Sequence, residues 1–354
     1  VGYINLIGFT ENSSRDFRKA LISVKADGAK SLVIDLRGNG GGSLAEAVNI
    51  VNLFVPRGKE IVSMKGKVRS SNYSYKSKNE PLDIEMPIVV LVNNGSASAA
   101  EIVAGALQDL DRAVIVGSKT FGKGLVQSVR DLPYNGSLKL TTSKYYIPSG
   151  RCIQAIDYKN RREGQKDRVA DSLANVFHTA GGREVRDSGG IMPDVEVKHD
   201  TLANLLFYLS NDDVLTDFAT DYCKTHLTIA PAAEFAISDA DFEAFKRMAV
   251  ESGFKYDRLS EKRLDDLKKV AEFEGYLKDA EAEFAALAKK LEHNLERDFD
   301  NFKDDIKKLV EMEIVKRYYF QRGTVESGLR DDIDFDKAVE ILHNPEEYNR
   351  ILGK

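Results

Sequence analysis

The chain of 354 residues is longer than one hydrophobic core usually supports, so the sequence predicts two domains. Hydrophobic residues make up 42% of the chain and charged residues 30%, which is typical of a folded globular protein and excludes a disordered or fibrous one. Acidic residues (56) outnumber basic residues (51), and the net charge of −5 disfavours a nucleic-acid-binding protein.

The cysteines and the first residues give information on disulfide bonds and on processing of the chain. Cys152 and Cys223 are too few for a framework of several disulfides, and a single bridge between them stays open. The chain begins at Val1 on an apolar segment typical of a strand, without an initiator methionine or a signal-like segment. We therefore expect a fragment or a processed form. No apolar stretch is long enough to predict a membrane span.

In the first half of the chain, short apolar runs alternate with amphipathic segments, which is typical of a layered α/β domain. Residues 31–36 and 87–92 are almost continuously apolar, as expected of strands covered on both faces. Between them, Ser43 and Glu46 have the spacing of a capping box and predict a helix that runs toward Val55. Apolar residues at helical spacing predict another helix before the first of these strands.

A β-hairpin is predicted further along the chain. The segment Tyr134–Gly136 contains the turn signal Asn-Gly and separates an apolar segment, 125–132, from an alternating one, 138–146. We therefore expect a mixed sheet with flanking helices. Residues 157–189 are polar and basic and are typical of an extended insertion. The α/β domain is assigned to residues 1–200.

The composition then changes to segments rich in Lys and Glu, so residues 201–354 are assigned to a mainly helical C-terminal domain. Apolar residues at helical spacing predict one long amphipathic helix here. They are Leu277, Phe284, Leu287, Leu291, Leu295, Phe302, Ile306 and Leu309. The charge pairs on its other face are most simply a solvated surface, and binding of a second copy or an adaptor through this domain is the less favoured interpretation.

Small residues follow the strand at 87–92 and precede a helix. In Asn93-Asn-Gly-Ser-Ala-Ser-Ala-Ala-Glu101, a serine can project from the tight turn while the first N–H groups of the helix remain free to stabilise an oxyanion. Ser98 is the candidate nucleophile. The alternative is that Ser96 or Ser98 only caps the helix, and this segment alone favours neither interpretation.

A serine nucleophile needs a base, and the first histidine of the chain is His178. No G-x-S-x-G motif surrounds Ser98, so a Ser-His-Asp hydrolase is disfavoured. Lys123 lies between two glycines before the hairpin, and in extended chain Gln127 shares its face and could orient its amine. A lysine accepts a proton only when neutral, so Lys123 is expected to be sheltered from water. The alternatives are a surface lysine in a glycine turn and a phosphate loop, whose motif is incomplete.

Glycines also follow the strand at 31–36. In Asp35-Leu-Arg-Gly-Asn-Gly-Gly-Gly42, free backbone N–H groups could stabilise an oxyanion, and the glycines could equally serve a tight turn that requires positive φ. The G-x-G-x-x-G motif of dinucleotide sites is not matched. Ser252-Gly-Phe-Lys255 matches S-x-x-K without its companion motifs and is interpreted as accidental. Acidic residues do not cluster with histidines at metal-ligand spacing, so neither a metal nor a cofactor is expected.

Taken together, five motifs in this order resemble those of the C-terminal processing peptidases, also called tail-specific proteases. They are Asp35-Leu-Arg-Gly-Asn-Gly-Gly-Gly42, Gly95-Ser-Ala-Ser-Ala-Ala-Glu-Ile102, Thr120-Phe-Gly-Lys-Gly-Leu-Val-Gln127, Lys144-Tyr-Tyr-Ile-Pro-Ser-Gly150 and Gly190-Ile-Met-Pro-Asp194. The resemblance implies a core related to crotonase and Clp protease. It also implies that Ser98 is the nucleophile, Lys123 the base and Gln127 the residue that orients the lysine.

The resemblance further implies an oxyanion hole, formed by the backbone N–H of Ala99 together with that of Gly41 or Gly42. Ala100 stands where the family often has serine, which removes no catalytic group. Members usually carry a peptide-binding PDZ domain just before the strand that begins here at Val1, and that domain is not expected in this chain. Members act mostly outside the bacterial cytoplasm, which implies the cell envelope or periplasm.

The sequence thus predicts a serine endopeptidase that cleaves extended or unfolded polypeptides at or near their C-terminal tails through an acyl-enzyme. Two other classes stay open. A crotonase-like acyl-CoA enzyme has a related fold and also uses an oxyanion hole, but it gives Ser98 no covalent role. The other class is an inactive peptide-binding scaffold, against which the intact Ser98, Lys123 and Gln127 argue.

Overall fold

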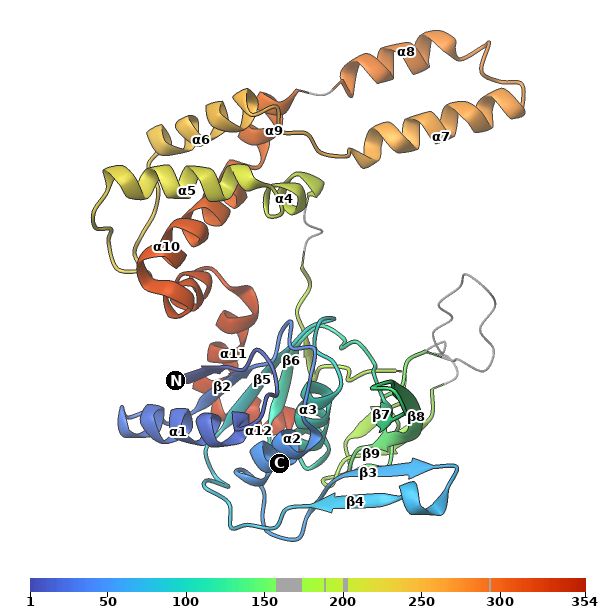
Figure 1. Cartoon of the computed structure of the whole chain (residues 1–354), viewed down its shortest axis with the longest axis vertical. Coiled ribbons are helices and arrows are strands. Elements are labelled where there is room, and N and C mark those ends of the chain that lie inside the picture. The colour runs from blue at the N-terminus through green and yellow to red at the C-terminus, as the bar shows by residue number, and fades with distance from the viewer. Residues whose placement is uncertain (157–173, 188, 200–202, 293) are drawn as a thin grey trace. The chain divides into compact units, whose positions relative to one another are not determined.

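The protein forms two compact units in the computed structural model (Figure 1). The first unit comprises Val1–Lys198 together with Asp332–Lys354, and the second comprises His199–Asp331. The last residues of the chain therefore return to the first unit, whereas the predicted division assigned them to the helical domain. The structure describes residues 1–156, 174–187, 189–199, 203–292 and 294–354.

A five-stranded parallel sheet forms the centre of the first unit. In spatial order its strands are β1 (Gly2–Asn5), β2 (Leu32–Asp35), β5 (Ile88–Val92), β6 (Val114–Gly117) and β11 (Val195–Glu196). Every residue of β2, β5 and β6 is buried, which explains why these strands are apolar almost throughout. β2 and β5 are the two strands predicted at 31–36 and 87–92.

Helices cover both faces of this sheet (Figure 1). They are α1 (Ser13–Ala26), α2 (Leu44–Asn52), α3 (Ala99–Asp109), α11 (Ile333–His343) and α12 (Pro345–Ile351). Alternate strand residues face opposite sides, so Ile34 and Val90 pack with α1, α2 and α3, whereas Val33 and Val89 pack with α11 and α12. The predicted α/β core with flanking helices is confirmed. The buried apolar face of α11 explains why the chain returns to this unit.

The antiparallel strands of the first unit form a sheet of their own. In spatial order they are β4 (Tyr73–Lys76), β3 (Glu60–Gly66), β8 (Ser137–Tyr146) and β7 (Leu125–Asp131), with the short helix η1 (Arg69–Ser71) between β3 and β4. The hairpin of β7 and β8 is the predicted one, and Tyr134 and Asn135 have positive φ, as a type I′ turn requires. The predicted insertion at 157–189 lies partly outside the described residues. Its described part contains the antiparallel strands β9 (Val176–His178) and β10 (Glu184–Arg186).

The second unit is helical, as predicted (Figure 1). Its helices are α4 (Asn204–Leu209), α5 (Asp213–Thr225), α6 (Asp239–Glu251), α7 (Leu259–Phe273), α8 (Glu281–Lys290), α9 (Leu295–Asn301) and α10 (Lys303–Gly328). The single long helix predicted between residues 277 and 309 is wrong. Asn294 accepts a hydrogen bond from the Arg297 N–H and so begins α9, and Phe302 leaves the helical backbone conformation. Among the described helices, none combines the length and hydropathy that a membrane crossing requires.

The two cysteines lie in different units and are both free thiols in this structure. The single disulfide that the sequence left open is therefore not formed here. Burial raises the pKa of the Cys152 thiol, which keeps it in the less reactive protonated form.

Arg37, which directly follows β2 and Leu36, ties the returning C-terminal helices to the sheet. Its guanidinium donates to Asp35 Oδ2 (2.6 Å), to Asp332 Oδ2 (2.6 Å) and to Asp334 Oδ2 (3.0 Å). Asp332 also caps α11 by accepting hydrogen bonds from the N–H groups of Asp334 and Phe335. One carboxylate therefore both begins α11 and anchors it to the end of β2.

Replacing Asp332 by Asn is expected to lower the free energy of unfolding by about 1–3 kcal/mol at neutral pH. Asparagine caps helices as well as aspartate does, so the loss isolates the ion pair. Burial raises the pKa of Asp332, but the hydrogen bonds from Arg37 and Phe335 outweigh it and hold the pKa below its ordinary value. The stabilisation is therefore present above the unfolded-state pKa of about 3.9 and is lost as pH falls through the lower folded-state pKa.

Urea unfolding followed by circular dichroism, at neutral pH and at about pH 2–3, measures this difference. The wild type and Asp332→Asn should differ at neutral pH and converge in acid. Asp336→Asn is the matched control, since Asp336 is an exposed residue of the same helix. A gap between wild type and Asp332→Asn that stays constant across this pH range would contradict the assignment.

Candidate active site

Ser98 stands where β5 is followed by α3, at the N-cap position of the helix. Its backbone has φ 57° and ψ −112°, a conformation that residues other than glycine rarely adopt and that costs about 1–3 kcal/mol. Strain of this kind persists only where the surrounding structure fixes it, and it clusters at functional sites. The side chain of Ser98 is half-buried. Ser98 therefore combines the cap position with the strained turn that a projecting nucleophile requires.

Ser96, the other serine considered as a cap, has a structural role. It is fully buried, and its Oγ donates to the Leu36 carbonyl (2.7 Å) and accepts from the Asn93 N–H (3.0 Å). These bonds join the ends of β2 and β5. Ser96 is therefore already committed to holding the loop, and Ser98 is the serine of this segment that is left for chemistry.

Glu101, in the first turn of α3, is a site residue that the sequence analysis missed. Its carboxylate is fully buried and accepts four hydrogen bonds, from the N–H of Ser98 (2.9 Å), Thr120 Oγ1 (2.6 Å), the N–H of Gly122 (2.7 Å) and the N–H of Lys123 (2.8 Å). Burial raises the pKa of Glu101, and the four donated bonds oppose that rise. One oxygen of this carboxylate thus binds the backbones of both Ser98 and Lys123. The available signal was the Ser-x-x-Glu capping spacing from Ser98 to Glu101.

Lys123 and Gln127 are less enclosed than predicted. The side chains of both are exposed, so the expectation that Lys123 is sheltered from water is wrong for this structure. A β-bulge opposite Val126 and Gln127 places one extra residue, Thr142, on the neighbouring strand β8. Neither side chain forms a hydrogen bond with another residue that the structure describes. The Glu101 carboxylate holds the backbone of Lys123 next to that of Ser98. The role of Gln127 stays a prediction.

Gly41 lies directly against the Ser98 turn. Its φ is +96°, and a Cβ atom there would lie 2.7 Å from the Ala97 carbonyl oxygen and 2.8 Å from Ser98 Cβ. The Gly41 N–H donates to Asn39 Oδ1 (2.9 Å) in this conformation. Ala99 is the first residue of α3, so its N–H has no acceptor within the helix. The Gly41 N–H lies in the glycine loop that packs against the Ser98 turn, and the Ala99 N–H belongs to the residue that follows Ser98.

Gly42, the alternative oxyanion donor, packs against a different part of the chain. Its φ is +144°, and a Cβ atom there would lie 2.2 Å from the carbonyl oxygen of Phe9. Phe9 and Gly42 are also paired in an isolated parallel bridge. The contacts of Gly42 thus fix the entry to α2, whereas those of Gly41 fix the Ser98 turn, which favours Gly41 as the donor.

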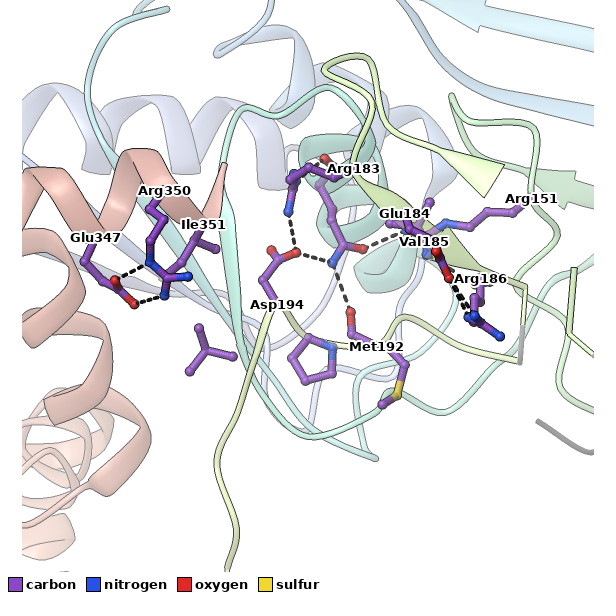
Figure 2. Close-up of a pocket in the computed structure, with 13 residues that line it drawn as sticks. Arg151, Arg183, Glu184, Val185, Arg186, Met192, Asp194, Glu347, Arg350 and Ile351 are labelled. Atoms are coloured by element: carbon purple, nitrogen blue, oxygen red, sulfur yellow. Dashed lines mark hydrogen bonds and ion pairs between the residues drawn. The ribbon is translucent and has the colours of Figure 1, made fainter. Parts of the chain in front are cut away.

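A cavity of about 630 Å³ opens at the opposite end of α3 from Ser98, around Gln108 (Figure 2). Asp194 is paired with Arg183, and Glu347 with Arg350, as Figure 2 shows, while Arg151 of the lining is paired with Asp109 outside it. None of the predicted site residues is among the described residues that line it. Within the described part of the chain, no group of three or more His, Cys, Asp and Glu residues could hold a metal ion.

The motif Gly190–Asp194 connects this far end of α3 to the Ser98 end. Asp194 accepts hydrogen bonds from Gln108 Nε2 (2.9 Å) and from the Ile115 N–H (2.8 Å). At the other end of the motif, the Ile191 N–H donates to Thr120 Oγ1 (2.6 Å), which in turn donates to Glu101. The motif therefore contacts both ends of α3 and, through Thr120 Oγ1, helps to position the Glu101 carboxylate.

Two family models match this chain. Residues 1–160 match the model of peptidase family S41. This region of the chain is therefore similar to the S41 peptidases. The predicted resemblance to the C-terminal processing peptidases is thereby confirmed. Beyond the S41 region, residues 205–342 match the family described as "Probable PDZ-protease, C-terminal helical domain".

Named relatives of the S41 region are peptidases. The carboxy-terminal-processing protease of Bartonella bacilliformis is 46% identical over 160 residues, which are 44% of this chain and 37% of that protein. The probable CtpA-like serine protease of Staphylococcus aureus N315 is 42% identical over 158 residues, 43% of this chain and 31% of that protein. The solved structure of the photosystem II D1 C-terminal processing protease is 30% identical with a TM-score of 0.43, covering 55% of this chain and 42% of that one. The chain spans about a third of the length of these curated relatives.

Proposed function

We propose that the chain is the catalytic part of a serine endopeptidase that cleaves polypeptides at or near their C-terminal ends. The class of enzyme follows from family S41 and from the relatives named as carboxy-terminal-processing proteases. The observation that carries the residue assignment is the strained backbone of Ser98, whose turn shares the Glu101 carboxylate with Lys123. Ser98 is the nucleophile and Lys123 the general base.

The proposed reaction has two stages. Ser98 Oγ attacks the carbonyl carbon of the scissile peptide bond while its proton passes to the neutral Lys123 amine, and the new oxyanion accepts hydrogen bonds from the Ala99 and Gly41 N–H groups. The C–N bond breaks as the leaving amine takes the proton from Lys123, and an acyl-enzyme on Ser98 remains. Water then attacks the ester with Lys123 as base, and the acid product and Ser98 are released. The Gly41 N–H exchanges its Asn39 partner for the oxyanion.

In this proposal the bound substrate shields the Lys123 side chain from water, to which it is exposed in the free protein. Among the strands that the structure describes, β7 is an edge strand that pairs with β8 alone, and it begins two residues after Lys123. An extended peptide can add to such an edge through main-chain hydrogen bonds that do not depend on its sequence. A peptide in this position covers Lys123 and excludes water, which favours the neutral amine. Gln127 lies on the same strand, where it can orient the amine.

The substrate class and the location rest on the resemblance. The relatives' printed activity, carboxy-terminal processing, supports extended C-terminal segments of polypeptides as substrates. The same resemblance supports the bacterial cell envelope or periplasm as the place of action. We include both in the proposal.

Mass spectrometry of an unfolded protein after incubation with the whole chain tests the function, with a serine-directed acylating probe as a second readout. New C-termini near the substrate's tail and a probe adduct on Ser98 are expected. A crotonase-like enzyme would give neither product, since Ser98 has no covalent role there. An inactive scaffold would bind the substrate and leave it intact. Cleavage with the adduct on another serine would reject Ser98 as the nucleophile.

A further inference from the structure

Two glycines flank Lys123, and both are buried against the segment that contains Gln154 and Ala155. A Cβ atom on Gly122 would lie 2.3 Å from Ala155 Cβ. One on Gly124 would lie 2.5 Å from the backbone nitrogen of Gln154. Contacts this short leave no room for a side chain at either position unless the packed segment moves. Both glycines beside the proposed base are therefore explained by the close approach of one other segment.

The side chain of Gln154 holds the residue that follows Lys123. Its Oε1 accepts a hydrogen bond from the Gly124 N–H (2.9 Å), and its Nε2 donates to the Ile156 carbonyl (3.1 Å). An amide side chain offers an acceptor and a donor at once, and these two partners fix which end of it faces Gly124. Because Gly124 is buried, its N–H would be costly to leave without an acceptor. The Gln154 amide thus meets a demand that the Lys123 loop itself creates.

The backbone on both sides of Gln154 is itself fixed. The Ile153 carbonyl accepts a hydrogen bond from the Gly190 N–H (2.8 Å), and the Ala155 N–H donates to the Gly122 carbonyl (2.9 Å). Ile153 and Ala155 are both buried. Gln154 therefore projects its amide from a fixed backbone, so the position of the amide can determine that of the Lys123 loop.

Glu101 and Gln154 together bind three consecutive N–H groups around the proposed base. The Glu101 carboxylate accepts from the first two, those of Gly122 and Lys123. Gln154 accepts from the third, that of Gly124. Lysine has a flexible stem of four carbons, so the region that its amine can reach is set by where its Cα atom is held. In the free protein these hydrogen bonds hold the Cα atom of Lys123.

We propose that Gln154 is a positioning residue for catalysis, which holds the Lys123 loop so that the lysine amine can reach Ser98 Oγ. It acts through Lys123 and needs no contact with the substrate. This role depends on the proposed function, in which Lys123 is the base for Ser98. Gln154 lies outside the five motifs of the resemblance, so its hydrogen bonds and its contact with Gly124 are what assign the role.

Gln154→Met tests the role, because methionine keeps the length of the side chain and removes both hydrogen bonds. We expect kcat for cleavage of an unfolded protein to fall at least about tenfold, with KM changed less than about twofold, because a displaced base weakens the transition state and not substrate binding. A variant with wild-type kcat, or one whose loss lies in KM alone, would contradict the positioning role.

Asn72→Leu is the matched control. Asn72 Oδ1 also accepts a hydrogen bond from a glycine N–H, that of Gly66 (2.8 Å), and leucine keeps the shape of asparagine while removing that bond. Gly66 ends β3, which β8 separates from β7 in the antiparallel sheet. The control therefore loses the same kind of bond away from Lys123, and it should cleave with the kcat and KM of the wild type.

The serine-directed acylating probe separates a misplaced base from a loss of folded protein. Gln154→Met should reach the same final fraction of chains labelled on Ser98 as the wild type, but at least about tenfold more slowly. A lower final fraction, labelled at the wild-type rate, would mean that Gln154 only stabilises the fold and would overturn the proposal. If the wild type itself gave no adduct on Ser98, the peptidase proposal would fail, and this role with it.

Gly124→Ala reaches the same contact from the loop and serves as the second variant if Gln154→Met does not fold. The added Cβ atom would displace the loop from the Gln154 backbone, and Gly124 does not have positive φ, so alanine introduces no backbone strain of that kind. Slow labelling to the full final fraction is expected again. Labelling of folded Gly124→Ala at the wild-type rate would reject the contact with Gln154 as a determinant of catalysis.

Discussion

Replacing Ser98 by Ala is expected to reduce kcat/KM for peptide cleavage by at least about a thousandfold, and replacing Lys123 by Ala should do the same. Without Ser98 there is no atom to form the acyl-enzyme, and without Lys123 no group takes the hydroxyl proton. Lys123→Arg should be as inactive as Lys123→Ala, because a guanidinium does not give up its proton in a protein. This variant distinguishes a base from a positive charge that only stabilises the oxyanion.

The two residues act as a unit, so the double variant should lose no more activity than either single variant. Initial rates on an unfolded protein substrate measure these losses. Ser137→Ala and Lys139→Ala are the controls, because both side chains are exposed on β8, away from the Ser98 turn. Both control variants should cleave the substrate at the wild-type rate. Substantial turnover by a folded Lys123→Arg variant would remove Lys123 from the role of base.

The parts of the site that sequence could predict are those set by local signals. The strand at 87–92 is apolar throughout because both of its faces are covered, and the small residues after it leave room for a strained turn at Ser98. The Asn-Gly signal located the β7–β8 hairpin, but the two residues with positive φ are Tyr134 and Asn135, so the turn lies one position earlier than the Asn-Gly pair. The glycine run was predicted to contain an N–H donor for the oxyanion. Only the contact between Gly41 and Ser98, which the structure shows, distinguishes Gly41 from Gly42 as that donor.

The parts that sequence could not predict depend on contacts between distant segments. Glu101 holds the site because residues 120–123 fold back onto it, and no local pattern encodes that approach. The bulge opposite Gln127 places one extra residue, Thr142, on β8, which the alternating pattern of residues 138–146 does not reveal. α11 is amphipathic like its helical neighbours, and only the ion pair of Asp332 with Arg37 and the apolar contacts to the sheet assign it to the first unit. Apolar periodicity likewise continues past Asn294, where a side-chain cap begins a new helix.

Gly41→Ala is expected to lower kcat/KM about a hundredfold, with a smaller change in KM, since displacing catalytic groups by about 1 Å has effects of this size. The added methyl group would lie 2.7 Å from the Ala97 carbonyl oxygen and 2.8 Å from Ser98 Cβ, and alanine disfavours φ +96°. The Ser98 turn must therefore move away from the Gly41 N–H. The rate at which the acylating probe labels Ser98 should fall in parallel, because both reactions need the same oxyanion donors.

Gly40→Ala is the control for this change, because it adds the same methyl group at the neighbouring position of the same loop. A Cβ atom on Gly40 would meet nothing within 4 Å, so the variant should cleave and label at close to the wild-type rate. Denaturation of both variants separates loss of function from loss of fold, and Gly41→Ala should cost about 1–3 kcal/mol of stability from backbone strain. If folded Gly41→Ala and Gly40→Ala cleaved equally well, the contact between Gly41 and the Ser98 turn would have no part in catalysis, and the oxyanion would have to be stabilised by Ala99 and a donor other than Gly41.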